Sequence, residues 1–187
     1  MPVDVIGLAP GKQRYGLLLN DEGGILDDLM FFNEGHDLSA DGPPLGAKAP
    51  SGGSDPHAMG ERGGQSFFVI VNGACKAADL AFIRERIGRR CDVLPMPDHA
   101  LLALQGPQAA AVLSRLSPGI ERFVFMTGGA VRIGDIPAFA TRSGYTGEDG
   151  FEISVAADKG DALARLLLAQ PEDKATGLGA RNSLRLE

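Results

Sequence analysis

The sequence lacks two features that would each assign it to a broad class, a long apolar run and an excess of basic residues. A membrane-spanning helix needs roughly 18 consecutive apolar residues, and no run of that length occurs. Basic residues are in the minority, with 18 Lys and Arg against 24 Asp and Glu, which gives a net charge of −6. Nucleic-acid binders usually present a basic face. The composition therefore predicts a protein with neither a membrane nor a nucleic acid as its partner.

Cysteine is also scarce. Cys75 and Cys91 show no CxxC spacing and have no histidine cluster beside them. We therefore expect reduced, buried and inert thiols rather than a disulfide or a metal site. Residues 1–5 include an acid and no basic stretch, so we expect no secretory signal peptide there.

What is present fits a globular protein. The 187 residues are 44% apolar and 22% charged, enough for a buried core in one large or two small domains. Residues 33–65 differ, because they are rich in Gly, Pro, Ser and Asp and nearly free of aliphatic side chains. We expect a flexible insertion there. His36 and His57 lie in it without metal-ligand spacing.

Hydrophobic periodicity outlines the remaining elements. We expect strands at 14–20, 25–32, 66–71, 91–96, 101–104, 123–126, 130–142 and 151–155, and helices at 74–87, 108–116, 161–169 and from 180 onward. This order predicts an α+β fold with mixed or antiparallel sheets and helices packed on them. A break at 117–119 suggests two subdomains, 1–116 and 117–187. The last helical pattern has no stop signal, so we expect a central piece of a longer protein.

Two places carry candidate chemistry. Residues 142–152 form a Gly-rich turn that leads into a strand with Glu152, which would fix a carboxylate on a pocket wall. The same Gly-Glu-Asp-Gly run also occurs in ordinary hairpin turns. Asp27 and Asp28 are adjacent in a predicted strand, so they face opposite sides and only one can enter a pocket. The pattern cannot choose between them, and a charged pair ending a hairpin strand is the alternative.

Four stretches, at 11–30, 101–107, 142–152 and 177–187, carry a family resemblance in their order and spacing. Over nearly the whole chain the sequence resembles the folate-dependent aminomethyltransferase family of the glycine cleavage system, the T-proteins. Against that family it lacks an N-terminal segment and the C-terminal region. In the family a short hairpin joins the strands that flank residues 33–65. The location implied is the cytoplasm of a bacterium or the mitochondrial matrix of a eukaryote.

The resemblance implies a reaction, its partners and its site residues. An aminomethyl group carried on the dihydrolipoyl arm of lipoylated H-protein is transferred to tetrahydrofolate, a co-substrate. Ammonia is released, 5,10-methylenetetrahydrofolate forms, and no metal takes part. Asp28 matches the catalytic residue, and the folate-binding and pocket positions match Tyr15, Asn72, Tyr145, Glu152 and Arg181.

Each residue type suits its implied role. An ionised aspartate stabilises the positive charge that develops on the transferred carbon. The carboxylate of Glu152 can accept two adjacent pterin N–H groups, and Arg181 offers a fork of donors to a carbonyl or carboxylate. Tyr15 can stack on the ligand or donate a hydrogen bond. Asn182 departs from the family, which usually has Asp at that position.

Three other readings stay open. Relatives that serve iron–sulfur cluster maturation carry a cysteine motif near the position of Tyr145, and none occurs here. A folate-binding module of a flavin amine oxidase is a second alternative, although no GxGxxG fingerprint is visible. The third is an inactive fragment, because the missing C-terminal region contributes to the family's folate site.

Overall fold

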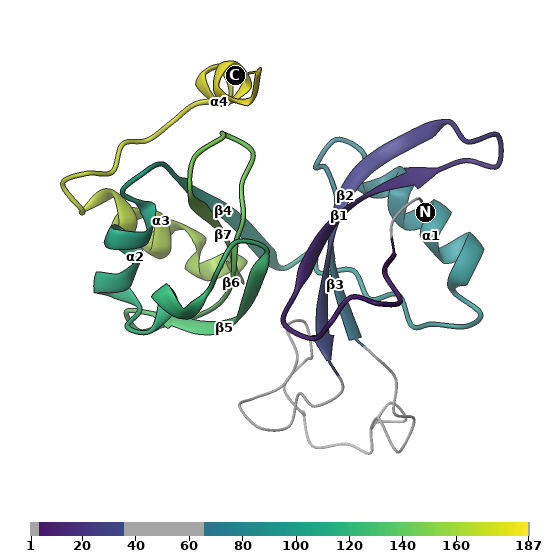
Figure 1. Cartoon of the computed structure of the whole chain (residues 1–187), viewed down its shortest axis with the longest axis horizontal. Helices are drawn as coiled ribbons and strands as arrows, with labels where there is room; N and C mark the ends of the chain where they lie inside the picture. Colours follow the sequence, from purple (N-terminus) through teal and green to yellow (C-terminus); the bar gives the residue numbers. More distant parts are fainter. Residues whose placement is uncertain (1–3, 36–65, 187) are drawn as a thin grey trace. The chain divides into compact units, whose positions relative to one another are not determined.

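The computed structural model describes residues 4–35 and 66–186 (Figure 1). They form two compact units, divided between Met96 and Pro97. Within these residues, no helix is both long and apolar enough to span a bilayer. The unit boundary differs from the break expected at 117–119, because the strand at residues 99–105 pairs along its whole length within the second unit.

The first unit is a three-stranded antiparallel sheet with one helix. Its strands are β1 (Gln13–Leu19), β2 (Ile25–Gly35) and β3 (Ser66–Ile70), in the order β1-β2-β3, and its helix is α1 (Lys76–Ile87). The turn between β1 and β2 is tied by Asn20, whose Oδ1 accepts from the backbone N–H groups of Glu22 and Gly24 at 3.1 and 2.6 Å. β2 pairs directly with β3, so the expected pairing of the strands that flank the polar stretch is confirmed.

The insertion expected at residues 33–65 begins later than expected. Residues 33–35 continue β2, and Asn33 is fully buried, with its side-chain amide donating to the Leu8 carbonyl at 2.5 Å. The rest of the expected insertion, 36–65, including both of its histidines, lies outside the described residues.

One face of this sheet is packed and carries the core of the first unit. Leu18 of β1 and Leu29 and Phe31 of β2 are buried there, against Phe82 and Ile83 of α1. Burying side chains of this size stabilises the fold by about 1.5–3 kcal/mol each. Alternation along β2 places Asp27 on this same face. A carboxylate therefore lies at the end of an apolar core.

The second unit is a four-stranded antiparallel sheet, in the order β4-β7-β6-β5, with helices packed on it (Figure 1). Its elements are β4 (His99–Gln105), α2 (Ala109–Leu116), η1 (Ile120–Arg122), β5 (Thr127–Ile133), β6 (Ile136–Arg142), β7 (Gly150–Ala156), η2 (Ala157–Lys159), α3 (Gly160–Leu168) and α4 (Leu178–Leu186). All pairings found in the described sheets are antiparallel. The predicted α+β class is confirmed.

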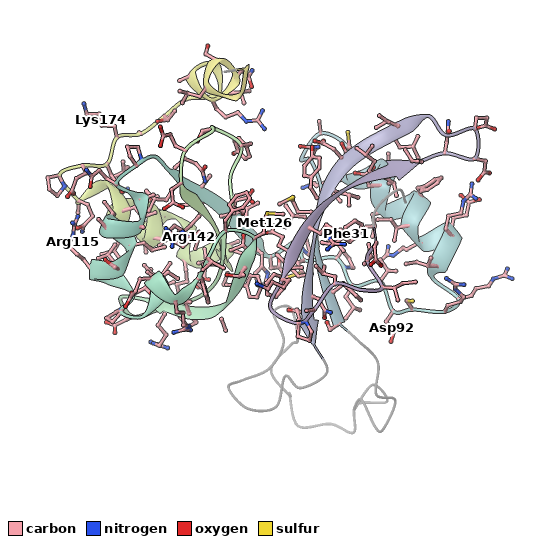
Figure 2. All side chains as sticks on the ribbon, in the orientation of Figure 1. Phe31, Asp92, Arg115, Met126, Arg142 and Lys174 are labelled. Atoms are coloured by element: carbon pink, nitrogen blue, oxygen red, sulfur yellow. The ribbon has the colours of Figure 1, made fainter. Side chains whose placement is uncertain are left out.

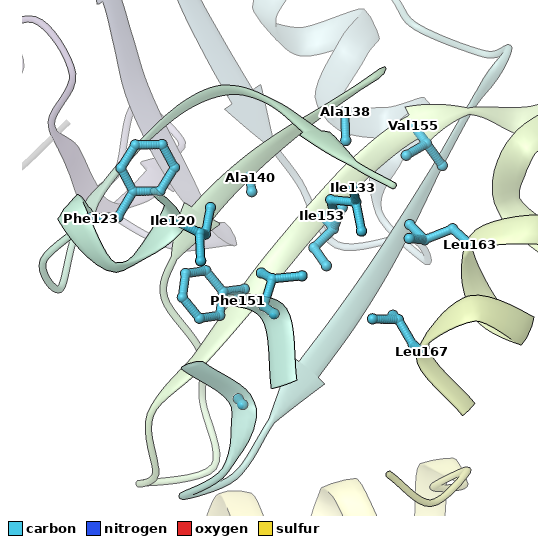
Figure 3. Close-up of a cluster of buried hydrophobic side chains, with 12 residues drawn as sticks. Ile120, Phe123, Ile133, Ala138, Ala140, Phe151, Ile153, Val155, Leu163 and Leu167 are labelled. Atoms are coloured by element: carbon cyan, nitrogen blue, oxygen red, sulfur yellow. The ribbon is translucent and has the colours of Figure 1, made fainter. Parts of the chain in front are cut away.

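The core of the second unit is built around β7 (Figure 3). Phe151, Ile153 and Val155 are fully buried, and Leu163 and Leu167 of α3 belong to the same cluster. The predicted strand at 151–155 is confirmed, but its polar positions are buried as well. The carboxylate of Glu152 therefore stands on a central strand within the fold.

Three strand predictions differ from the structure. Residues 91–96 form no strand, since Pro95 and Pro97 remove two backbone donors there. Residues 123–126 form a turn in which Met126 has a φ of 62°. The single strand expected at 130–142 is two, because Gly134, with a φ of 56°, begins the turn between β5 and β6.

Candidate functional site

The two adjacent aspartates of β2 occupy opposite faces of the first sheet. Asp27 is 7% exposed and shares the packed face with the unit's core, whereas Asp28 is half-buried on the other face. Leu17 of β1 is directly opposite Asp28, and Tyr15 lies two residues along the same strand. Tyr15 therefore shares the face of Asp28, and its side chain is 48% exposed.

Asn72, just after β3, binds both aspartates. Its Nδ2 donates to Oδ1 of Asp28 at 2.6 Å, to Oδ1 of Asp27 at 2.9 Å and to the backbone carbonyl of Asp28 at 3.0 Å. Its backbone N–H donates to Oδ2 of Asp27 at 3.1 Å. The side chain of Asn72 is thus fixed through Asp27, and the carboxylate of Asp28 is held by the same amide.

Two side chains at the start of α1 lie behind Asp27. Asp79 forms a side-chain hydrogen bond with it, and the Cys75 thiol lies close enough to feel its charge. Burial, followed by the hydrogen bond and charge of Asp27, raises the pKa of Asp79 to about 6. Burial also raises the pKa of the Cys75 thiol, with Asp27 adding to the effect. Burial works to raise the pKa of Asp27 too, but its hydrogen bonds, led by those from Asn72, hold that pKa below its usual value.

The raised pKa fits the expectation of an inert thiol at Cys75, which is half-buried. Cys91, expected to be buried, is exposed, since it lies in the irregular segment after α1. Both cysteines are free. Across residues 4–35 and 66–186, no group of three or more His, Cys, Asp or Glu side chains is placed to hold a metal ion.

In the second unit, Glu152 is held by a chain of buried hydroxyls. The Ser143 hydroxyl donates to Oε2 of Glu152 at 2.7 Å, and the hydroxyls of Thr141 and Ser143 are 2.9 Å apart. Thr141 pairs directly with Glu152 across β6 and β7, which places both on one face. Glu152 is 9% exposed, and Ser143 supplies its one side-chain donor among the described residues.

The Gly-rich loop between β6 and β7 is closed by Gln105, at the end of β4. Its Nε2 donates to the Ser143 carbonyl at 3.0 Å, and a Cβ at Gly144 or Gly150 would collide with its amide. Of the loop's glycines, only Gly147 has a positive φ, at 79°. Gly144 and Gly150 therefore leave room for the Gln105 amide against the loop, a different role from the ligand approach that the sequence suggested.

An ion pair anchors the ends of this loop. Arg142 donates from Nε and Nη2 to the two carboxylate oxygens of Asp149 at 2.9 and 2.6 Å. Its Nη1 donates to the Phe123 carbonyl at 2.7 Å, and its own carbonyl accepts from the N–H of Met126 at 2.8 Å (Figure 2). The hydrogen bond from Arg142 is the main cause that lowers the pKa of Asp149. This bidentate pair fixes the base of the hairpin that carries Tyr145.

Tyr145 and Arg181 lie together in the second unit. The Arg181 guanidinium carbon lies 4.5 Å from the centre of the Tyr145 ring, within cation–π range. The Nη1 of Arg181 also donates to Oδ1 of Asn182 at 3.1 Å. An aspartate at this position could accept the same bond, so Asn182 keeps the contact and removes a charge.

The predicted site residues thus form two groups, one in each unit. Tyr15, Asp28 and Asn72 are together in the first, and Tyr145, Glu152 and Arg181 belong to the second. Sequence reasoning missed the residues that hold them, Gln105, Ser143 and Asp79. The first two stood inside motifs already singled out. For Asp79 the signal was an acidic residue at a core-facing position of an otherwise apolar helix face.

Comparison with known proteins identifies the relatives of this chain. Residues 57–187 match the model of the GCVT N-terminal domain family. An aminomethyltransferase from Synechococcus is 36% identical over 194 residues, covering 100% of this chain and 46% of that relative. The mitochondrial aminomethyltransferase of Mus musculus is also 36% identical, covering 98% of this chain and 40% of that relative.

A solved structure agrees with this match. The crystal structure of the glycine cleavage system aminomethyltransferase T from Bartonella henselae superposes with a TM-score of 0.74 at 37% identity. The match covers 99% of this chain and 43% of that one. The chain spans less than half the length of the curated relatives it matches. Its sequence and its fold together show that it belongs to the GCVT N-terminal domain family, whose members here are aminomethyltransferases of the glycine cleavage system.

Proposed function

We propose that this chain supplies the catalytic aspartate and a folate-binding carboxylate of a tetrahydrofolate-dependent aminomethyltransferase. The substrate is an aminomethyl group bound through sulfur to the dihydrolipoyl arm of H-protein. The observation that carries the proposal is the Asp28 carboxylate, held at 2.6 Å by the Asn72 amide on the sheet face it shares with Tyr15.

Asp28 has the chemistry that the reaction requires. As ammonia leaves the aminomethyl carbon, positive charge develops there, and a fixed carboxylate stabilises it without having to reorient. One folate nitrogen takes the place of ammonia on the carbon, the C–S bond then breaks to return the dihydrolipoyl thiol, and a second folate nitrogen closes the methylene bridge. The two protons lost from the folate nitrogens go to the leaving ammonia and to the sulfur. Asn72 fixes one oxygen of Asp28, so the carboxylate keeps one orientation through the reaction.

Glu152 has the role of orienting the pterin. Ser143 occupies one side of the carboxylate, on Oε2. Two adjacent N–H groups on a pterin ring match the acceptor geometry of a carboxylate. Because β7 is a central strand and the Ser143 hydroxyl is buried, binding folate needs no reorganisation of this acceptor.

Tyr145 and Arg181 support the same ligand. Arg181, stacked on the Tyr145 ring, keeps donors for a carbonyl or carboxylate of the folate. Tyr15 offers an exposed aromatic face in the first unit. We propose H-protein as the partner, and a location in the bacterial cytoplasm or the mitochondrial matrix, in line with the names of relatives such as the mouse protein.

Calorimetric titration of the 187-residue chain with tetrahydrofolate tests the binding half of this proposal. Saturable binding that is weakened in Glu152→Ala and kept in Glu148→Gln, an exposed carboxylate of the same loop, supports it. Equal affinity of parent and Glu152→Ala would remove Glu152 from the folate site.

Turnover is measured in a protein of the relatives' length, because the relatives are more than twice as long as the stretch they share with this chain. A chimera in which this chain replaces the matching segment of the Synechococcus relative provides one. We expect the chimera to form methylenetetrahydrofolate from aminomethylated H-protein. A folded chimera that binds folate and forms none would contradict the proposal.

A further inference from the structure

A buried carboxyl pair lies behind the proposed catalytic residue. Asp79, on the first turn of α1, is 3% exposed, and Asp27, on β2, is 7% exposed. Their side chains are hydrogen-bonded to each other. Two carboxylates cannot form that bond when both are ionised, because neither then carries a donor. One of the two must hold a proton.

The surroundings assign the proton to Asp79. Asp27 accepts from the backbone and side chain of Asn72, which favours its ionised form. Oδ2 of Asp79 is buried and has no donor among the described residues, so an ionised Asp79 would leave that oxygen unsatisfied. A protonated Asp79 instead donates to Asp27. Because burial raises its pKa to about 6, Asp79 holds this proton below about pH 6 and releases it above.

The groups that face Asp79 are few. Asp27 comes from β2 and Cys75 from the residue before α1, and Asp28 acts on the same thiol through its charge. No lysine or arginine forms an ion pair with Asp27 or Asp79 in the described part of the chain. With no cation paired to either residue, the proton on Asp79 is what keeps two negative charges from being buried side by side.

We propose that Asp79 is a positioning residue for Asp28, acting through a hydrogen-bonded chain from Asp79 to Asp27, Asn72 and Asp28. Asp79 fixes Asp27, Asp27 binds Asn72 at two points, and the amide of Asn72 orients the Asp28 carboxylate. Of these four residues, only Asp28 has a proposed contact with the substrate. The proposal rests on the proposed function only for the role of Asp28.

The test uses the 187-residue chain with two substitutions. Asp79→Ala removes the donor to Asp27, and Asp79→Asn keeps a donor but cannot ionise. Glu85→Gln, an exposed charge removal on the same helix, is the control. The measured quantity is the exchange rate of the side-chain amide protons of Asn72 by NMR at about pH 5, below the pKa of Asp79. This rate reports positioning whether or not Asp28 is catalytic.

We expect Asp79→Ala to speed this exchange by about tenfold or more, the factor for one lost hydrogen bond. Asp79→Asn and Glu85→Gln should stay near the parent rate. An unchanged rate in Asp79→Ala would overturn the proposal. If Asp79→Ala does not fold, Asp79→Asn is measured alone. This variant keeps a donor to Asp27, so an exchange rate near that of the parent supports the proposal and a rate tenfold faster overturns it.

A second measurement connects the contacts to the reaction. In the chimera at about pH 5 to 6, where Asp79 holds its proton, Asp79→Ala should lower kcat about tenfold or more and leave the dissociation constant for tetrahydrofolate unchanged, with Asp79→Asn restoring kcat. Faster amide exchange with an unchanged kcat would overturn the positioning role while leaving the folate site intact. An inactive parent chimera would count against the proposed function alone, because the NMR result on the chain stands independently.

Discussion

Of the two adjacent aspartates, Asp27 has the larger structural role. The alternation of a strand predicts that Asp27 and Asp28 face opposite sides, and they do. It does not predict which side is packed, because apolar neighbours flank both. The core-facing Asp27 has two hydrogen-bonding partners, Asn72 and Asp79, so its substitution cannot be treated as neutral.

We predict that Asp27→Asn lowers the free energy of unfolding of the chain by about 1–3 kcal/mol, the cost of a disrupted buried hydrogen-bonding group. The amide that replaces the carboxylate would present a donor to Asn72, which is itself a donor. Urea denaturation measures the effect, with Glu22→Gln, exposed in the preceding turn, as the control. Equal stability of Asp27→Asn and the parent would refute the hydrogen-bonded chain described for this strand.

We predict that Glu152→Ala weakens tetrahydrofolate binding by about 1.5–3 kcal/mol, the usual size of a lost charged hydrogen-bonding partner. Ser143→Ala should have a smaller effect in the same direction, because it frees the carboxylate to rotate without removing it. Calorimetry on the chain measures both. A larger loss in Ser143→Ala than in Glu152→Ala would mean that the hydroxyl, not the carboxylate, meets the ligand.

Candidate site residues can be named from the sequence only where a motif contains them. The resemblance named Asp28, Asn72 and Glu152, and the structure adds their supports. Ser143 and Gln105 act through contacts between strands far apart in sequence, which no local pattern encodes.

At the scale of elements, the packing of α1 on β2 depends on pH, because the carboxyl of Asp79 lies between them and titrates. Asp79 has its pKa raised from 3.8 to about 6 in the folded chain, mainly by burial. The folded state therefore binds more protons than the unfolded state between these values, and stability falls as pH rises through that window. Above about pH 6, the free energy of unfolding is lower by about 3 kcal/mol, at roughly 1.4 kcal/mol for each unit of the pKa difference.

We predict that Asp79→Asn removes this dependence. The unfolding free energy of the parent, minus that of Asp79→Asn, should decrease between about pH 4 and pH 7 by up to about 3 kcal/mol. Urea denaturation at a series of pH values gives this difference, and subtracting the variant cancels titrations elsewhere in the chain. A difference that is flat with pH would mean that Asp79 is ionised throughout.

The hairpin of β6 and β7 depends on its ion pair. We predict that Asp149→Asn lowers stability by about 1 kcal/mol, near the upper end for partly exposed pairs, because the pair is bidentate and its arginine also binds the Phe123 carbonyl. Asp161→Asn breaks an exposed pair with Arg165 one turn along α3 and should leave the melting temperature unchanged. Equal losses of stability in Asp149→Asn and Asp161→Asn would show that the bidentate geometry of the Arg142 pair adds no stability.

Most elements followed from periodicity, and the failures have physical causes. β1, β2, β3, β4 and β7 and all four α-helices of the described residues lie where apolar spacing predicted them. The strand expected at 91–96 had apolar residues but no neighbouring strand to pair with, and pairing is what stabilises a strand. In α1, Ala78 and Ala81 fit the helical spacing of apolar residues and yet are exposed, since the face with Asp79, Phe82 and Ile83 is the one that packs inward.

At the scale of the whole molecule, the chain is two units with separate cores. Each unit contains one group of the proposed site residues, attached to a central strand: Asp28 on β2 and Glu152 on β7. The sequence indicated two domains but set the division about twenty residues late, because the Pro-Gly break after α2 is more conspicuous than the linker before β4.

The central claim is that Asp28 acts on the charge that develops during aminomethyl transfer. The most direct test is the rate at which the chimera and its Asp28→Asn variant form methylenetetrahydrofolate from aminomethylated H-protein, together with the tetrahydrofolate affinity of each. We predict a fall in kcat of about 10²–10³-fold, the usual effect of removing a group that stabilises transition-state charge, with affinity nearly unchanged. An Asp28→Asn variant that turns over within a few-fold of the parent would contradict the account.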